Sequence, residues 1–155
     1  SLLSTGQGML AGNSSAFTFL VHAETEENPY VASRPFRINA GAVHSYAVLP
    51  GDRTRYLEEL RAGDEVLVVD AGGGTTLATV GRVKIEVRPL LLIAAETDSG
   101  KGRVFLQNAE TIRLVTPEGL PVSVVSLSEG DRVLCRTEQG GRHFGMRITE
   151  NIEER

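Results

Sequence analysis

Residues 60–67 read LRAGDEVL, and the chain returns to nearly the same pattern at residues 127–134, LSEGDRVL. In both copies a Gly-Asp pair stands before an apolar run of strand length. Glycine supplies the positive φ of a tight turn and aspartate caps it, so the pattern predicts a turn that leads into a buried strand. We interpret Asp64 and Asp131 as equivalent turn caps without a chemical role. The repeat predicts two related β units, about residues 58–95 and 122–150, packed into one domain that spans residues 51–155.

On both sides of the repeat, runs of β-branched and apolar residues alternate with turns rich in Gly, Pro and Asp. Only residues 53–61 have a pattern that suits a helix, and that helix would be short. We therefore expect an all-β fold, barrel-like or sandwich-like, with little helix. The expected strands are residues 16–23, 43–49, 65–70, 77–87, 90–95, 103–106, 111–115, 122–127 and 132–136.

Composition excludes several classes of protein. The net charge of the 155 residues is -4, and Lys and Arg form no dense cluster, so a nucleic-acid partner is not expected. The longest apolar runs are too short to cross a bilayer, and the first residues lack the pattern of a signal peptide. Cys135 is the single cysteine, which fits a reducing compartment. We expect a cytoplasmic protein without a membrane partner, either processed at its start or a fragment of a longer polypeptide.

Residues 1–50 differ from the rest and form the expected site-bearing segment. His22 and Glu24 lie two apart on a predicted strand, so their side chains face the same way. Together with His44 they offer either ligands for a divalent metal or a general base with its orienting partner. The alternative is that His22 is a hydrogen-bonded structural residue at a strand end.

Two arginines flank Pro35-Phe36 in the same segment. The planar forks of Arg34 and Arg37 suit bidentate binding of a carboxylate or a phosphate. The alternative is a surface ion pair with Glu26 or Glu27, which would contribute little to stability.

Two further polar groups stand out later in the chain. Residues 107–111 place amide and carboxylate side chains between two predicted strands, either as a turn or as ligands for substrate hydroxyls. We expect this group to share a cavity with the N-terminal site. Lys84, Glu86 and Arg88 follow one face of a predicted strand and are interpreted as an exposed charge ladder.

The glycines at positions 6, 8 and 12 do not have the spacing of a dinucleotide fingerprint. A predicted strand comes after them, whereas the fingerprint requires a helix whose N-terminus holds the pyrophosphate. The chain therefore predicts no Rossmann unit, and we interpret residues 13–15 as a polar loop.

Several stretches of the chain resemble the type II 3-dehydroquinate synthase family, which also contains the 3-amino-4-hydroxybenzoate synthases. The resemblance covers essentially the whole chain and places it in the C-terminal half of longer proteins. It is carried by GMLAGNSS (8–15), FLVHAET (19–25), PYVASRPFRINAG (29–41), HSY (44–46), LQNAET (106–111) and HFG (143–145).

The resemblance implies cyclisation of an open-chain C7 amino-keto acid. In the synthase branch NAD⁺ takes a hydride from the amine-bearing carbon, and the imine is hydrolysed to a ketone. An enolate then attacks this new ketone and closes the ring. In the aminohydroxybenzoate branch the amine is kept, the ring aromatises, and a divalent metal such as Mn²⁺ takes part. The implied partners are the small-molecule substrate and the N-terminal part of the same enzyme, with a homo-oligomer as a further possibility.

Residue chemistry suggests roles at the positions that the resemblance supports. His22 with Glu24 is the expected base, and Arg34, or an ion held by His22, Glu24 and His44, is expected to stabilise the enolate. The residues expected to bind substrate are Arg34, Arg37, Asn39, Gln107, Asn108 and Glu110. Two interpretations of other classes remain open: a non-catalytic β module that binds a ligand or protein, and a metal enzyme of double-stranded β-helix type. The second is weakened because the chain lacks the His-x-His spacing of that fold.

Overall fold

The structure is a computed structural model that describes residues 6–24, 37–98, 100–137, 147–148 and 151–154. Strands dominate, and no helix in these ranges reaches seven residues, which confirms the all-β prediction. Three 3₁₀ turns, η1 (Pro50–Asp52), η2 (Leu57–Glu59) and η3 (Val124–Ser126), connect strands. The strands are β1 (Gly8–Ser14), β2 (Phe17–His22), β3 (Tyr46–Val48), β4 (Thr54–Tyr56), β5 (Glu65–Val69), β6 (Thr75–Thr79), β7 (Leu90–Thr97), β8 (Gly100–Gln107), β9 (Arg113–Val115), β10 (Pro121–Ser123), β11 (Leu134–Thr137), β12 (Arg147–Ile148) and β13 (Asn151–Glu154).

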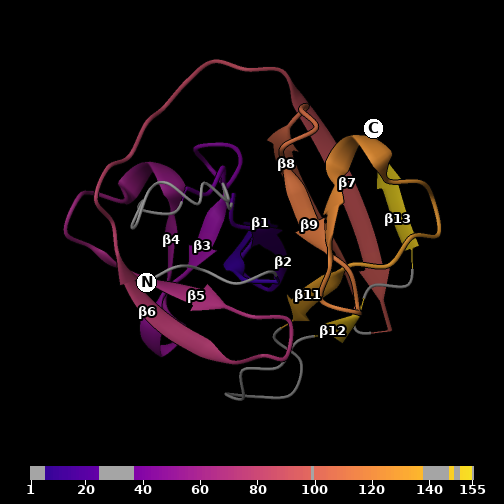
Figure 1. Cartoon of the computed structure of the whole chain (residues 1–155), viewed down its shortest axis with the longest axis horizontal. Coiled ribbons are helices and arrows are strands. Elements are labelled where there is room, and N and C mark those ends of the chain that lie inside the picture. The colour runs from indigo at the N-terminus through magenta and orange to yellow at the C-terminus, as the bar shows by residue number, and fades with distance from the viewer. Residues whose placement is uncertain (1–5, 25–36, 99, 138–146, 149–150, 155) are drawn as a thin grey trace, which may run out of the picture.

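Two antiparallel sheets make up the fold (Figure 1). The larger has the order β10-β9-β2-β1-β3-β4, with β5 and β6 joined to β1 and with β11 and β12 joined to β2. The smaller has the order β13-β7-β8. The strands of the described ranges do not close into a barrel, so these residues do not form the closed one of the two expected architectures.

Strand β1 lies in the middle of the larger sheet, although the sequence pattern did not predict it. It pairs with β2, β3 and β5. The sequence pattern does not indicate this strand because it contains glycine, which is a poor strand former. Gly8 is nonetheless required here, since a Cβ at this position would lie 1.8 Å from the Val21 carbonyl oxygen. The expected polar loop at 13–15 is instead the end of β1 followed by a tight turn.

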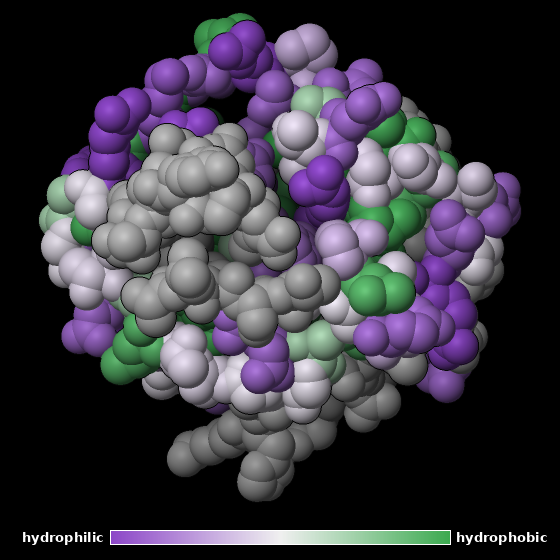
Figure 2. Space-filling view, viewed as in Figure 1, coloured by the Kyte–Doolittle hydropathy of each residue, from purple (hydrophilic) through white to green (hydrophobic). Residues whose placement is uncertain are grey.

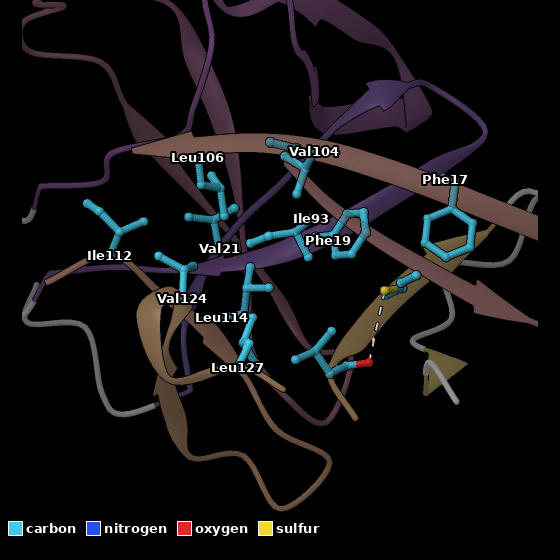
Figure 3. Close-up of a cluster of buried hydrophobic side chains, with 14 residues drawn as sticks. Phe17, Phe19, Val21, Ile93, Val104, Leu106, Ile112, Leu114, Val124 and Leu127 are labelled. Atoms are coloured by element: carbon cyan, nitrogen blue, oxygen red, sulfur yellow. Dashed lines mark hydrogen bonds between the residues drawn. The ribbon is translucent and has the colours of Figure 1, made fainter. Parts of the chain in front are cut away.

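The main hydrophobic core joins the two sheets. Phe17, Phe19 and Val21 alternate along β2 and pack against Ile93 of β7 and other buried side chains of β8 and β9 (Figure 3). Side chains of one strand that alternate in this way face one side of a sheet. Burying each large apolar side chain of this kind stabilises the fold by about 1.5–3 kcal/mol. The core therefore fixes the smaller sheet, and with it the end of β8, against β2.

The two repeated turns have the same hydrogen bonds. The Asp64 carboxylate accepts the Arg61 N–H at 2.8 Å, and the Asp131 carboxylate accepts the Ser128 N–H at 2.9 Å. Gly63 and Gly130 have the same φ of 95°. Both aspartates cap equivalent turns, as the repeat predicted. The division of residues 51–155 into two β units stays a prediction.

Three expected elements take another form. Residues 53–61 form β4 and η2 in place of a short helix. The strand expected at 122–127 ends at Ser123, and η3 follows it directly. The strand expected at 77–87 ends at Thr79, and residues 80–89 belong to no strand. In the described ranges, no helix has the length and apolar character needed to cross a membrane.

Candidate functional site

Polar side chains from several parts of the chain meet along residues 37–44, which we name the 37–44 strip. Its first residue pairs with the chain after β2, because the Glu24 N–H donates to the Arg37 carbonyl oxygen at 2.7 Å. Its later part runs beside the end of β8, where the Ala42 N–H donates to the Phe105 carbonyl oxygen at 3.3 Å. Ile38 packs against two of the buried clusters. The strip is therefore anchored to both sheets.

A glycine lets the strip approach β8 closely. Gly41 has a φ of 107°, a conformation that L-residues rarely adopt. A Cβ at this position would lie 2.4 Å from the Phe105 carbonyl oxygen. The local sequence thus permits a backbone contact between the strip and β8 that any other residue would strain.

An amide pair forms the centre of the strip. The Asn39 side chain donates from Nδ2 to Oε1 of Gln107 at 2.5 Å, in a partly buried position. An amide carries both a donor and an acceptor group, so this bond leaves Oδ1 of Asn39 and Nε2 of Gln107 with further hydrogen-bonding capacity. Neighbouring donor and acceptor groups suit the hydroxyl or carbonyl groups of a polar small molecule. Of the residues expected to bind substrate, these two are brought into direct contact.

His44 lies at the far end of the strip and is exposed. Its ring meets the Phe105 ring edge-on, with centroids 6.0 Å apart. The aromatic contact orients the imidazole, and the residue as a whole stays exposed.

His22, in contrast, is buried, and a backbone group occupies one of its nitrogens. The Gly6 N–H donates to Nε2 at 3.0 Å, so the ring proton lies on Nδ1. Burial lowers the pKa of His22, the Ala23 backbone opposes this effect, and the positive charge of Arg113 adds to it. Nδ1 is buried and has no hydrogen-bond partner among the described residues. Burial therefore disfavours the charged form of the ring, and the bond to Gly6 ties the ring to the chain just before β1. The choice between a structural and a catalytic role for His22 stays a prediction.

The expected metal triad is not assembled by the described residues. Among them, no group of three His, Cys, Asp or Glu side chains is placed to hold one ion. His22 is buried with Nε2 already used, Glu24 is half-buried beside Arg37, and His44 is exposed beside Phe105. The described geometry therefore gives no support to the triad of His22, Glu24 and His44.

The other expected site residues lie at different places. Arg37 is exposed at the start of the strip, and Asn108 and Glu110 are exposed in the turn between β8 and β9. The turn interpretation thus describes the backbone of residues 108–111, whereas Gln107 is the last residue of β8 and contacts Asn39 of the strip. Arg34 lies outside the described residues, as do its alternative partners Glu26 and Glu27. Their assignments stay predictions.

Sequence reasoning missed a pair of tyrosines beside the strip. Tyr46 of β3 and Tyr56 of β4 are register partners, their rings stack at 4.5 Å, and their hydroxyls lie 2.8 Å apart. The hydrogen bond with Tyr46 raises the pKa of Tyr56, and the charge of Tyr46 acts in the same direction. Only the register of β3 and β4 brings the two rings together, so no local signal could have revealed the pair.

A second missed contact links distant parts of the larger sheet. The guanidinium of Arg136 on β11 lies 2.5 Å from the Asp52 carboxylate in η1. Arg136 is nearly buried, which makes an ion-pair partner necessary. The pair fixes the turn before β4, and therefore Tyr56, relative to β11.

The fold and the strip define the class of the molecule: an antiparallel β domain in which a strip of polar residues is anchored to both sheets and contacts Gln107 of β8. A family described as the 3-dehydroquinate synthase II C-terminal domain matches residues 1–155. The chain belongs to this family, which confirms the resemblance seen in its sequence.

Curated relatives extend well beyond the matched region. The chain is 59% identical over all 155 residues to a "3-dehydroquinate synthase homolog" of Aquifex aeolicus, and it covers 47% of that protein. It is also 59% identical over 155 residues to proteins named "3-dehydroquinate synthase" from Methanocaldococcus jannaschii and Methanospirillum hungatei, covering 43% and 47% of them. The chain thus spans less than half the length of these relatives. No solved structure matches it.

Proposed function

We propose that this chain is the C-terminal domain of a 3-dehydroquinate synthase, an enzyme that cyclises an open-chain C7 amino-keto acid. The observation that carries the proposal is the 59% identity, over the whole chain, with proteins of that name. The 37–44 strip supports it, because the substrate class has a carboxylate, hydroxyls and carbonyl groups, and the strip offers a partner for each.

In this proposal the strip binds and orients the substrate. The exposed Arg37 guanidinium binds the carboxylate, since its fork matches two carboxylate oxygens. Asn39 and Gln107 hold a hydroxyl and the carbonyl that becomes the enolate. His44 takes the proton from the carbon beside that carbonyl. The enolate carbon then attacks the ketone that oxidation and hydrolysis have put in place of the amine, and the alkoxide so formed takes back the proton from His44. His22 has a positioning role, since it holds the backbone at Gly6.

NAD, which the resemblance implies, does not fit the described residues of this chain. They include no helix of seven or more residues, and Gly8 and Gly12 lie within β1, not before a helix. A dinucleotide site of the usual kind needs a helix N-terminus for the pyrophosphate. In our proposal, a nicotinamide cofactor therefore binds to the remaining part of the enzyme.

The experiment is an assay of the full-length enzyme with the amino-keto acid, with and without NAD and Mn²⁺. Formation of NADH together with ammonia supports the dehydroquinate reaction. An aromatic amine formed without NADH would assign the chain to the aminohydroxybenzoate branch. If neither product forms under any combination, the catalytic proposal fails and a ligand-binding β module replaces it.

Two variants test the strip itself. Arg37→Ala should raise KM at least about tenfold with little change in kcat, because the lost interaction binds the unreacting carboxylate. His44→Gln should lower kcat by about 100-fold or more, because it removes the group that transfers the proton. Arg132→Ala is the matched control, since Arg132 is also exposed but lies in the turn before β11. Equal effects of Arg37→Ala and Arg132→Ala would refute the role of the strip.

A further inference from the structure

Residues 81–90 form an arm that connects β6 of the larger sheet to β7 of the smaller sheet. Every residue from Gly81 to Leu90 is exposed. The arm is held at its two ends, where Val80 exchanges backbone hydrogen bonds with residues 63 and 64 and where the Pro89 carbonyl oxygen accepts the Asn108 N–H at 3.0 Å. Between these points it stands away from the body of the molecule (Figures 1 and 2).

The side chains of the arm alternate as they do in a strand with one buried face. Glu86 contacts both Lys84, at 2.5 Å, and Arg88, at 3.0 Å, so these three side chains lie on one side. Contacts between residues two apart require an extended backbone. The intervening residues Ile85 and Val87 therefore point to the opposite side, together with Val83.

This opposite side is apolar and uncovered. Val83, Ile85 and Val87 are 42%, 65% and 102% exposed. A neighbouring row of exposed β-branched side chains is unusual for a monomer surface and marks an interaction site. The charged side does not require a partner, because its three groups neutralise one another in part. The hydrogen bond from Lys84 lowers the pKa of Glu86, and the hydrogen bond from Arg88 is the next largest cause in the same direction.

The backbone of the arm is unpaired as well. Residues 80–89 belong to no strand, and between the two anchoring ends no backbone hydrogen bond joins the arm to another described residue. Unpaired N–H and C=O groups on an extended, apolar-faced segment are a template for strand addition. The sequence thus specifies a strand whose partner is not among the described residues.

The geometry points to one occupant of this face, which is a sheet in the part of the full-length enzyme that lies outside these 155 residues. The arm adds as a strand to the edge of that sheet. The relatives are more than twice as long as the chain, which leaves room for such a sheet. The net charge of Arg82, Lys84, Glu86 and Arg88 is positive, so the accepting edge is expected to be apolar with flanking acidic residues.

Docking of a sheet on the arm also affects the candidate site, because one end of the arm is anchored beside that site. Asn108, which binds the Pro89 carbonyl oxygen, directly follows Gln107 of the amide pair. A sheet docked on the arm therefore covers the region beside the 37–44 strip. The inference rests on the proposed function only for the existence of a longer enzyme, and it concerns assembly, not chemistry.

The test is amide hydrogen exchange of the full-length protein, read in peptides that cover residues 81–90. Strand addition should slow about half of the arm amides by about 100-fold or more relative to an unstructured peptide, since every second N–H points to the partner. Val87→Asp should abolish this protection and leave β7 and β8 protected. Leu120→Asp, at a side chain that is 58% exposed in another turn, is the matched control and should leave the arm protected.

Two results would overturn the inference. Exchange of the wild-type arm at the unstructured rate would show that it has no partner. Protection that disappears on dilution, together with a dimer in sedimentation analysis, would assign the face to a second copy of the chain. Because exchange is measured without substrate, these results are independent of whether the proposed reaction occurs.

Discussion

Replacing His22 with leucine tests whether this residue is a structural support. Leucine fills a similar volume with an apolar side chain but removes Nε2, which accepts the Gly6 N–H at 3.0 Å. A buried backbone donor that loses its partner costs about 1–3 kcal/mol. We therefore expect His22→Leu to lower the free energy of unfolding of the 155-residue chain by this amount at about pH 8.

The loss should depend on pH in a defined direction. Burial lowers the pKa of His22 from 6.5 in the folded state, so below pH 6.5 the unfolded chain binds more protons than the folded chain. The contribution of neutral His22 is complete above pH 6.5 and is lost as the pH falls, by at most about 1.4 kcal/mol per pH unit. The free energy of unfolding of His22→Leu does not fall in this way, because leucine does not bind a proton. The difference between variant and wild type should therefore shrink on acidification.

Urea unfolding of both proteins at about pH 8 and about pH 5 measures the two effects. His44→Leu is the matched control, because His44 is exposed, and we expect its stability to remain within about 0.5 kcal/mol of wild type at both values. The reasoning is refuted if His22→Leu is as stable as wild type at the higher pH. It is also refuted if the difference between them does not change with pH.

Three further predictions concern the strip and its neighbours. Gly41→Ala should lower the free energy of unfolding by about 3 kcal/mol, against about 1 kcal/mol for Gly63→Ala, because both have positive φ but only Gly41 also meets Phe105; equal losses in urea unfolding would contradict the close contact. Asp64→Asn should change stability by about 0.5–1 kcal/mol and leave turnover of the full-length enzyme unchanged, since Asp64 caps a turn; a collapse of turnover at unchanged stability would be the opposing result. Tyr46→Phe should move the pKa of Tyr56 down toward its ordinary value of 10.0, which an ultraviolet titration measures; an unchanged titration would show that the hydroxyl contact is absent in solution.

Local chemistry explains why much of the fold could be predicted. The alternation of side chains along Phe17–His22 follows from the period of a strand, and the Gly-Asp turns follow from positive φ and a capping carboxylate. Both signals lie within a few residues of sequence. Strand β1 was not predicted, because the reason for its glycine lies in a neighbouring strand and not in the local sequence. Gly8 has no side chain at the point where the Val21 carbonyl oxygen approaches.

The sequence predicted which types of residue form the candidate site, but it did not predict which of these residues contact one another. Polar side chains at Asn39 and Gln107 interrupt an apolar pattern, and that interruption marked both as candidates. Their contact spans 68 positions of sequence and depends on how β8 packs beside the strip. His22 shows the reverse case: its spacing with Glu24 suggested a catalytic pair, and only the structure reveals that its ring is buried and accepts the Gly6 N–H.

Sequence information was sufficient for the strand class, the repeated turns capped by Asp64 and Asp131, the family, and the set of polar residues available for a site. Each of these depends on neighbours along the chain or on the chain's likeness to its relatives. Three-dimensional packing was needed to learn which residues meet, which histidine is buried, and that the segment after Thr79 stands unpaired. Local sequence patterns do not predict these features. Strand register and sheet packing depend on many weak contacts between residues that are distant in the sequence.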